Sequence, residues 1–185
     1  MLDFWFGAPA SAARGRPRKV WFEKSDAFDR EIRVRFSETW ERAARGELKS
    51  WQATPLAALA LTVVLDQFPR NMFRGTAQAF ASDALALETA QRTVAAGFDR
   101  LLRPLERVFA YLPFEHAEDN DAQRRALELF ESLDPGLPGS NYLDYARRHH
   151  EIVARFGRFP HRNALLGRAS TLEEIEFLKQ PGSGF

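Results

Sequence analysis

The stretch "TPLAALALTVVLDQFPRNMFRG", residues 54–75, contains the signals that indicate the fold. Thr54 followed by a proline is a typical helix start, because threonine suits the N-cap and proline suits the first helical position. Residues 56–65 are apolar nearly all round, as in a helix buried among other helices. A residue before proline is disfavoured in α geometry, so the helix is expected to end at Phe68. The stretch predicts a buried helix closed by a tight turn.

Signals of the same kind divide the rest of the chain into helices, and no stretch shows the sustained alternation that strands require. Besides the helix that begins at 54, we expect helices over about 25–45, 82–96, 104–112 with an interruption at Pro113, 119–132, 141–156 and 171–179. The clearest linker-like turn is "DPGLPGS", residues 134–140. Helices of this length joined by short turns pack as antiparallel neighbours. The sequence predicts one all-α domain, residues 1–185, built from antiparallel helical hairpins.

Composition narrows the class of protein. The 185 residues carry 26 basic and 25 acidic side chains, and a net charge of +1 provides no field to attract nucleic acid or an anionic membrane. The absence of cysteine excludes disulfides, thiolate chemistry and cysteine-ligated zinc. The first residues do not resemble a signal peptide, and no apolar run approaches the roughly 18 residues of a spanning helix. We therefore expect a soluble cytoplasmic protein with no nucleic-acid or membrane partner.

A second stretch, "RFGRFPHRNALLG" at residues 155–167, repeats the turn at 68–75: Phe-Pro, Arg-Asn and a closing glycine. Arginine and asparagine serve such corners by bonding free carbonyls and tolerating left-handed geometry. The two turns have more arginines than such corners require: Arg70, Arg74, Arg158 and Arg162. If the turns meet, these side chains must bind carboxylates of their own chain, which is the more frequent case, or an anionic ligand.

Residues 111–121, "YLPFEHAEDND", supply acidic groups and a histidine. A general-base pair such as Asp66 or Glu115 with His116 could carry out hydrolysis. The sequence contains no nucleophile elbow, glycine-rich phosphate loop or serine triad order. It also lacks H-E-x-x-H and paired E-x-x-H motifs, so no metal site and no cofactor are predicted. An acid–base or metal-assisted hydrolase using Glu115 and His116 is therefore the alternative function.

Five strings resemble, in order and over essentially the whole chain, a bacterial family known only as domain of unknown function 924. They are "LDFWFG" (2–7), "LDQFPRNMFRG" (65–75), "AFASDALAL" (79–87), "YLPFEHAED" (111–119) and "RFGRFPHRNALLGRASTLEEIEFL" (155–178). The resemblance implies an all-helical fold similar to tetratricopeptide-like superhelices. It implies no established activity, so no catalytic residue is transferred from it.

The main functional hypothesis is a binding module whose helical hairpins form a polar groove. The groove would hold a small anionic or peptide ligand, or the chain's own tail at 180–185. Ten residues are expected to line it: Asp66, Arg70, Asn71, Arg74, Glu115, His116, Arg158, His161, Arg162 and Asn163. Exposed apolar residues beyond the needs of the core would serve a homodimer contact.

Overall fold

The computed structural model describes residues 1–12, 14–133, 135, 137–138 and 141–184, and all the regular structure in these ranges is helical. The α-helices are α1 (Leu2–Phe6), α2 (Asp26–Ala44), α3 (Pro55–Thr62), α4 (Phe68–Met72), α5 (Asp83–Ala95), α6 (Pro104–His116), α7 (Asn120–Glu131), α8 (Tyr142–Phe156) and α9 (Leu172–Leu178). The predicted all-α class is confirmed. Residues 134, 136, 139 and 140 of the predicted turn cluster lie outside the described ranges.

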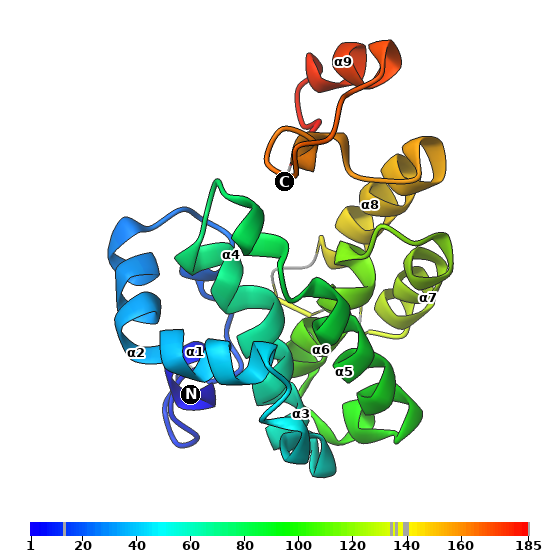
Figure 1. Ribbon diagram of the computed structural model, residues 1–185. Coiled ribbons are helices and arrows are strands. Elements are labelled where there is room, and N and C mark those ends of the chain that lie inside the picture. The colour runs from blue at the N-terminus through cyan, green and yellow to red at the C-terminus, as the bar shows by residue number, and fades with distance from the viewer. Residues whose placement is uncertain (13, 134, 136, 139–140, 185) are drawn as a thin grey trace.

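The helices pack mainly against their neighbours in sequence (Figure 1). Helix α5 packs on α3 and α6, α6 on α7, and α7 on α8, whereas α2 covers α4. The segment that carries α9 projects from the body of the molecule at one end (Figure 1). Within the described ranges, none of the helices has both the length and the apolar character that crossing a bilayer requires.

Two separate apolar clusters hold these parts together. The larger one centres on Trp5, which is fully buried and whose ring lies 5.6–5.7 Å from those of Phe28, Phe68 and Phe109. The smaller one contains Ile152, Val153 and Phe159, with two further phenylalanines packed against it. The smaller cluster joins Phe159 and Phe177 of the projecting C-terminal segment to α8, so the segment is anchored outside the main cluster, and polar contacts add to this attachment.

The helix that begins at Pro55 does not end at Phe68 as predicted. A π-helical turn, Val63–Gln67, follows α3 and leads directly into α4. Pro69 has no N–H to donate to the carbonyl of Leu65, four residues earlier. The hydroxyl of Ser82 donates to that carbonyl instead, over 2.6 Å. Proline is tolerated because a side chain from another element replaces the lost hydrogen bond.

Pro113 does not interrupt α6, which also differs from the prediction. The helix runs through it from Pro104 to His116. The residues around the proline, Leu112 and Phe114, are buried in the main cluster. Tertiary packing thus outweighs the local cost of an internal proline, and it carries the helix on to Glu115 and His116.

Candidate functional site

A buried carboxylate, Asp66, lies at the centre of the polar side chains. It is 0% exposed and is carried by the π-helical turn, a structure often found at functional sites. Its Oδ1 lies 2.8 Å from Nδ1 of His116 and 3.2 Å from Nη1 of Arg70, and its Oδ2 accepts from Gln67 at 2.6 Å. Burial opposes ionisation, but the charge of Arg70 and the contact with His116 outweigh it and hold the pKa of Asp66 well below its usual range.

The contact with Asp66 fixes the protonation of His116. Burial, together with the charge of Arg70, lowers the pKa of the His116 ring, so the ring is neutral at neutral pH. An ionised carboxylate can only accept, so Nδ1 carries the ring proton and donates it to Asp66. The opposite nitrogen, Nε2, is therefore the basic one.

The two Phe-Pro turns meet at Asp83, the first residue of α5. Both Nη atoms of Arg70, from the first turn, donate to the carboxylate of Asp83 over 2.8 and 2.9 Å. Nη1 of Arg162, from the second turn, donates to Oδ2 of the same carboxylate over 3.3 Å. One acid from a third element thus holds the two guanidinium groups together.

Arg162 is the less completely neutralised of the two arginines. It is 6% exposed, and its guanidinium carbon lies 4.6 Å from the ring centroid of Phe80 and 4.5 Å from that of Phe159. Its Nε is buried and has no hydrogen-bond partner among the described residues. Burial and the neighbouring charge of Arg70 lower the pKa of Arg162 to about 10. A charged donor with unused capacity is therefore buried in contact with two aromatic rings.

Glu115 contacts His149 of α8, with Oε1 3.0 Å from the Nδ1 of that ring. Burial and the charge of Asp66 raise the pKa of Glu115 to about 8. Burial and the nearby His116 lower the pKa of His149 to about 2. Both groups are uncharged at neutral pH. Of the two partners that the sequence offered for His116, the structure pairs Asp66 with it, and Glu115 contacts His149 instead.

Four of the ten predicted residues lie in two other clusters. Asn71 and Arg74 both bind Asp29 of α2, over 2.7 and 3.0–3.2 Å. In the second turn, Arg158 and Asn163 both bind a buried glutamate of α9, Glu174. Each turn therefore ties its own asparagine and one arginine to an acid of an adjacent helix, which is a structural use of the repeated motif.

His161 lies near Arg162 and Phe159, the latter at 5.6 Å between ring centroids. Burial and the charge of Arg162 lower its pKa to about 4. A methyl group added at Gly184 would lie 3.5 Å from the Cβ of His161, so the tail passes beside this ring. Phe185, at the end of the tail, lies outside the described residues.

The sequence did not single out several groups that complete the site. Asp83, near the start of the expected helix 82–96, and Phe80 entered only within the family string 79–87, and Glu118 only as one of the acids of residues 111–121. Glu118 accepts from the backbone N–H of Phe159 over 2.8 Å and from both Nη atoms of Arg168, which joins the second turn to the end of α6. Across the described residues, no group of three or more His, Cys, Asp and Glu side chains is arranged to hold a metal ion.

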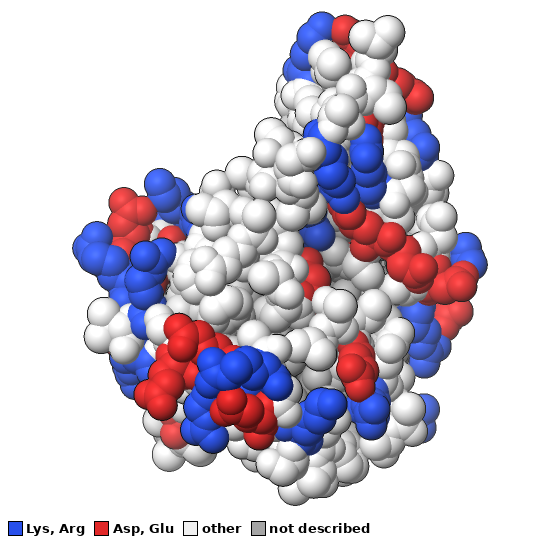
Figure 2. Space-filling view, in the orientation of Figure 1, with Lys and Arg blue, Asp and Glu red and all other residues white. Residues whose placement is uncertain are grey.

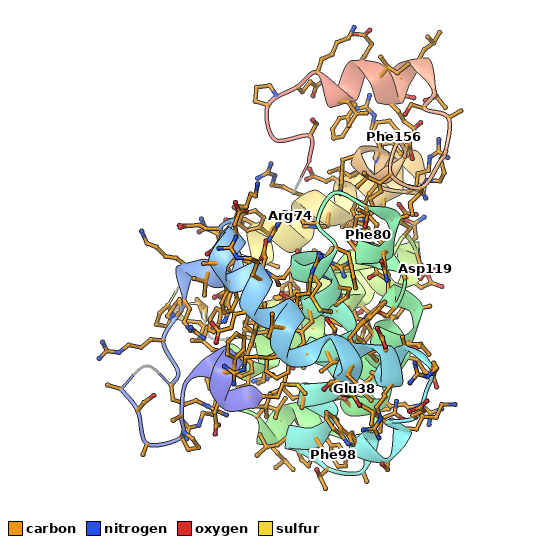
Figure 3. The ribbon with its side chains drawn as sticks, turned by 60° about the vertical axis from the view of Figure 1, so that its left-hand side comes forward. Glu38, Arg74, Phe80, Phe98, Asp119 and Phe156 are labelled. Carbon is orange, nitrogen blue, oxygen red and sulfur yellow. The ribbon has the colours of Figure 1, made fainter. Side chains whose placement is uncertain are left out.

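Figure 2 shows a hollow between the projecting C-terminal segment and the body, with basic and acidic surface side by side at its floor. In Figure 3, Phe80 lies below the segment that carries Phe156. Phe80, which contacts Arg162 of the second turn, thus belongs to the side of the body that faces the C-terminal segment.

The buried titratable groups predict a maximum of stability near pH 6.5. His149 and His161 have folded pKa values of about 2 and about 4, so the unfolded chain binds more protons below pH 6.5 and stability falls there. Glu115 has a folded pKa of about 8, so between pH 4.5 and 8 it keeps a proton that the unfolded chain has lost. Its contribution to stability therefore falls as the pH rises to 8. Between pH 4.5 and 6.5 the gain in stability from the two histidines is larger than the loss from Glu115, so stability rises with pH. Above pH 6.5 only the loss from Glu115 remains, and stability falls by up to about 1.4 kcal/mol per pH unit.

Urea unfolding from pH 5 to 9 checks this profile. The Gln of Glu115→Gln cannot ionise, so this variant should lose the fall in stability between pH 6.5 and 8. Its stability should still rise with pH below pH 6.5. An unchanged slope in that variant would show that Glu115 does not carry the decline.

Comparison with known proteins gives a consistent result. A family model described as "Bacterial protein of unknown function (DUF924)" matches residues 1–182. A solved structure of a protein of unknown function from Agrobacterium tumefaciens is 45% identical and superposes with a TM-score of 0.83, covering 96% of this chain and 94% of that one. A search of curated proteins finds no match.

Proposed function

This chain belongs to the bacterial DUF924 family, whose description assigns no activity, and we propose that it is a module that binds a small anionic ligand at Arg162. The ligand presents a carboxylate or a related oxyanion, either on a metabolite or at the end of a peptide. Arg70, which shares the carboxylate of Asp83 with Arg162, completes the polar surroundings.

The unused Nε of Arg162 is the observation that carries this proposal. A guanidinium has five N–H donors, and the one hydrogen bond described for this side chain runs from Nη1 to Asp83. Leaving a charged donor buried without an acceptor costs free energy, so the unsatisfied Nε–H group needs an explanation. An oxyanion that accepts from Nε and from one Nη would satisfy it in the bidentate geometry that arginine favours.

The surroundings of Arg162 support the same conclusion. Phe80 and Phe159 both pack against the guanidinium, and the side chain is buried, so little water reaches it. Electrostatic attraction is stronger in such a place than in bulk water. Asp83 is already shared with Arg70, which takes two hydrogen bonds from it, so a second anion is the natural partner of Arg162.

Calorimetric titration with acetate, citrate and a peptide bearing a free C-terminal carboxylate tests the proposal. Arg162→Met keeps the apolar stem between the rings and removes the charge, so binding of the responsive probe should weaken about 10- to 100-fold, as expected for a charged hydrogen bond of roughly 1.5–3 kcal/mol. Arg92→Met, at an exposed pair with Glu88, is the control and should bind as the wild type does. Equal affinity in Arg162→Met would overturn the proposal.

The Asp66–His116 contact favours acid–base hydrolysis as a second candidate function. A carboxylate 2.8 Å from Nδ1 orients the ring and leaves Nε2 as a general base. His116→Gln should then abolish any turnover of ester or phosphoester substrates and leave anion binding by Arg162 in place. A wild type that hydrolyses none of these substrates between pH 5 and 9 would eliminate this candidate.

A further inference from the structure

We propose that a hollow between α2 and α4, separate from Arg162, binds a small phosphomonoester. The hollow has a volume of about 370 Å³, which lies within the roughly 300–1,000 Å³ of small-molecule sites. Four basic side chains line it, together with two acids: Lys24, Arg30, Arg33, Arg74, Asp26 and Asp29.

The acids of the hollow are already neutralised. Asp29 accepts from Asn71 and Arg74 of the first turn, and Asp26 pairs with Lys24 at 3.5 Å. Arg30 and Arg33, by contrast, have no acidic partner among the described residues. Four cations against two acids leave a local charge of +2, which matches the dianion of a phosphomonoester.

Arg33 is held in position for such a ligand. Its Nη2 donates to the carbonyl of Met72, the last residue of α4, and its guanidinium lies 5.7 Å from the ring centroid of Phe73. The remaining N–H groups of Arg33 have no acceptor in the described chain. Because less side-chain freedom is lost on binding, a guanidinium fixed in this way binds phosphate oxygens more readily than a free one.

The position of the hollow adds to the attraction. Asp26 and Asp29 belong to the first turn of α2, so the positive end of that helix lies beside the hollow. Arg74 lies by the same end of α2 (Figure 3), where it binds Asp29. The hollow is also larger than a single phosphate group, so it leaves room for the organic part of an ester.

Calorimetric titration at low ionic strength with glycerol 3-phosphate and with inorganic phosphate tests this site. The double variant Arg30→Gln/Arg33→Gln should weaken glycerol 3-phosphate binding at least about tenfold, because it removes both unpaired charges. Arg35→Gln, on the same helix but paired with Glu31, is the matched control and should bind as the wild type does. All of these side chains are exposed, so the variants should stay folded, with at most a small fall in melting temperature from the lost contact of Arg33 with Met72.

Glycerol 3-phosphate binding more tightly than inorganic phosphate would support an ester ligand. Equal affinity for the two probes, unchanged affinity in the double variant, or no binding of either probe would each overturn the proposal. Arg162→Met should leave this site intact. A failure here is therefore separate from a failure of the Arg162 site.

Discussion

Replacing Asp66 by alanine should lower the free energy of unfolding by about 3–5 kcal/mol, the usual cost of removing one partner of a buried ionic group. The carboxylate is fully buried and contacts His116, Arg70 and Gln67. Without it, the guanidinium of Arg70 keeps only Asp83 as an acidic partner, and the proton on Nδ1 of His116 loses its acceptor. Urea unfolding at pH 6.5 measures the change.

The matched control is Asp121→Ala, which removes an exposed carboxylate paired with Arg124 on the surface of α7. That pair should contribute less than about 1 kcal/mol. A loss in Asp66→Ala no larger than in the control would mean that Asp66 is not the structural centre of the polar cluster.

Replacing Glu174 by alanine should release the C-terminal segment without unfolding the body. Glu174 accepts from Arg158 over 2.7 and 2.8 Å, from Asn163 over 3.2 Å and from the backbone N–H of Thr171 over 2.7 Å. The apolar packing of the segment is limited to the small cluster with α8, so these bonds supply much of its stability. Loss of the Glu174 carboxylate should lower the free energy of unfolding of the segment by about 3 kcal/mol. Amide exchange over residues 157–182 should then accelerate roughly 100-fold.

Glu173→Ala provides the control from the same helix, because Glu173 makes one exposed ion pair, with Arg155. Hydrogen exchange followed by mass spectrometry distinguishes the outcomes. Faster exchange confined to 157–182 in Glu174→Ala alone is the expected result. Faster exchange spread evenly over α2 to α7 would show instead that the segment and the body unfold as one unit.

Local signals in the sequence predicted the helices well. The helices expected from about 25 and 171 begin there: Ser25 accepts from the N–H of Phe28 as an N-cap, and Thr171 with Glu174 forms a capping box. The helix expected over 141–156 is found at Tyr142–Phe156. These features depend on residues three or four positions apart, so the sequence itself contains the relevant contacts.

The features that sequence reasoning missed depend on distant partners. The chain continues past Phe68 because Ser82 supplies the missing hydrogen bond to Leu65. Glu115 contacts His149, 34 residues away. Asp83 has the sequence signature of a helix start, and the same position serves as the meeting point of the two turns. Such pairings follow from how the helices pack, which no local pattern encodes.

The candidate site was predicted in part. Asp66, Arg70, His116 and Arg162 were named from the two turns and the acidic stretch, and the structure brings them together around Asp66 and Asp83. Asn71, Arg74, Arg158 and Asn163 share the motif but bind other acids. Residue type alone could not separate these two groups, because both contain arginines whose partners lie elsewhere in the chain.

The most direct test of the central claim observes the Nε–H of Arg162 itself. In a ¹H–¹⁵N spectrum of the arginine side chains, assigned through the loss of one signal in Arg162→Met, the protein is titrated with the oxyanion that binds in calorimetry. The claim predicts that the Arg162 Nε–H signal shifts downfield and exchanges more slowly with water as an acceptor is gained, while the signal of Arg92 stays in place. Binding of the anion with no change in the Arg162 signal would contradict it.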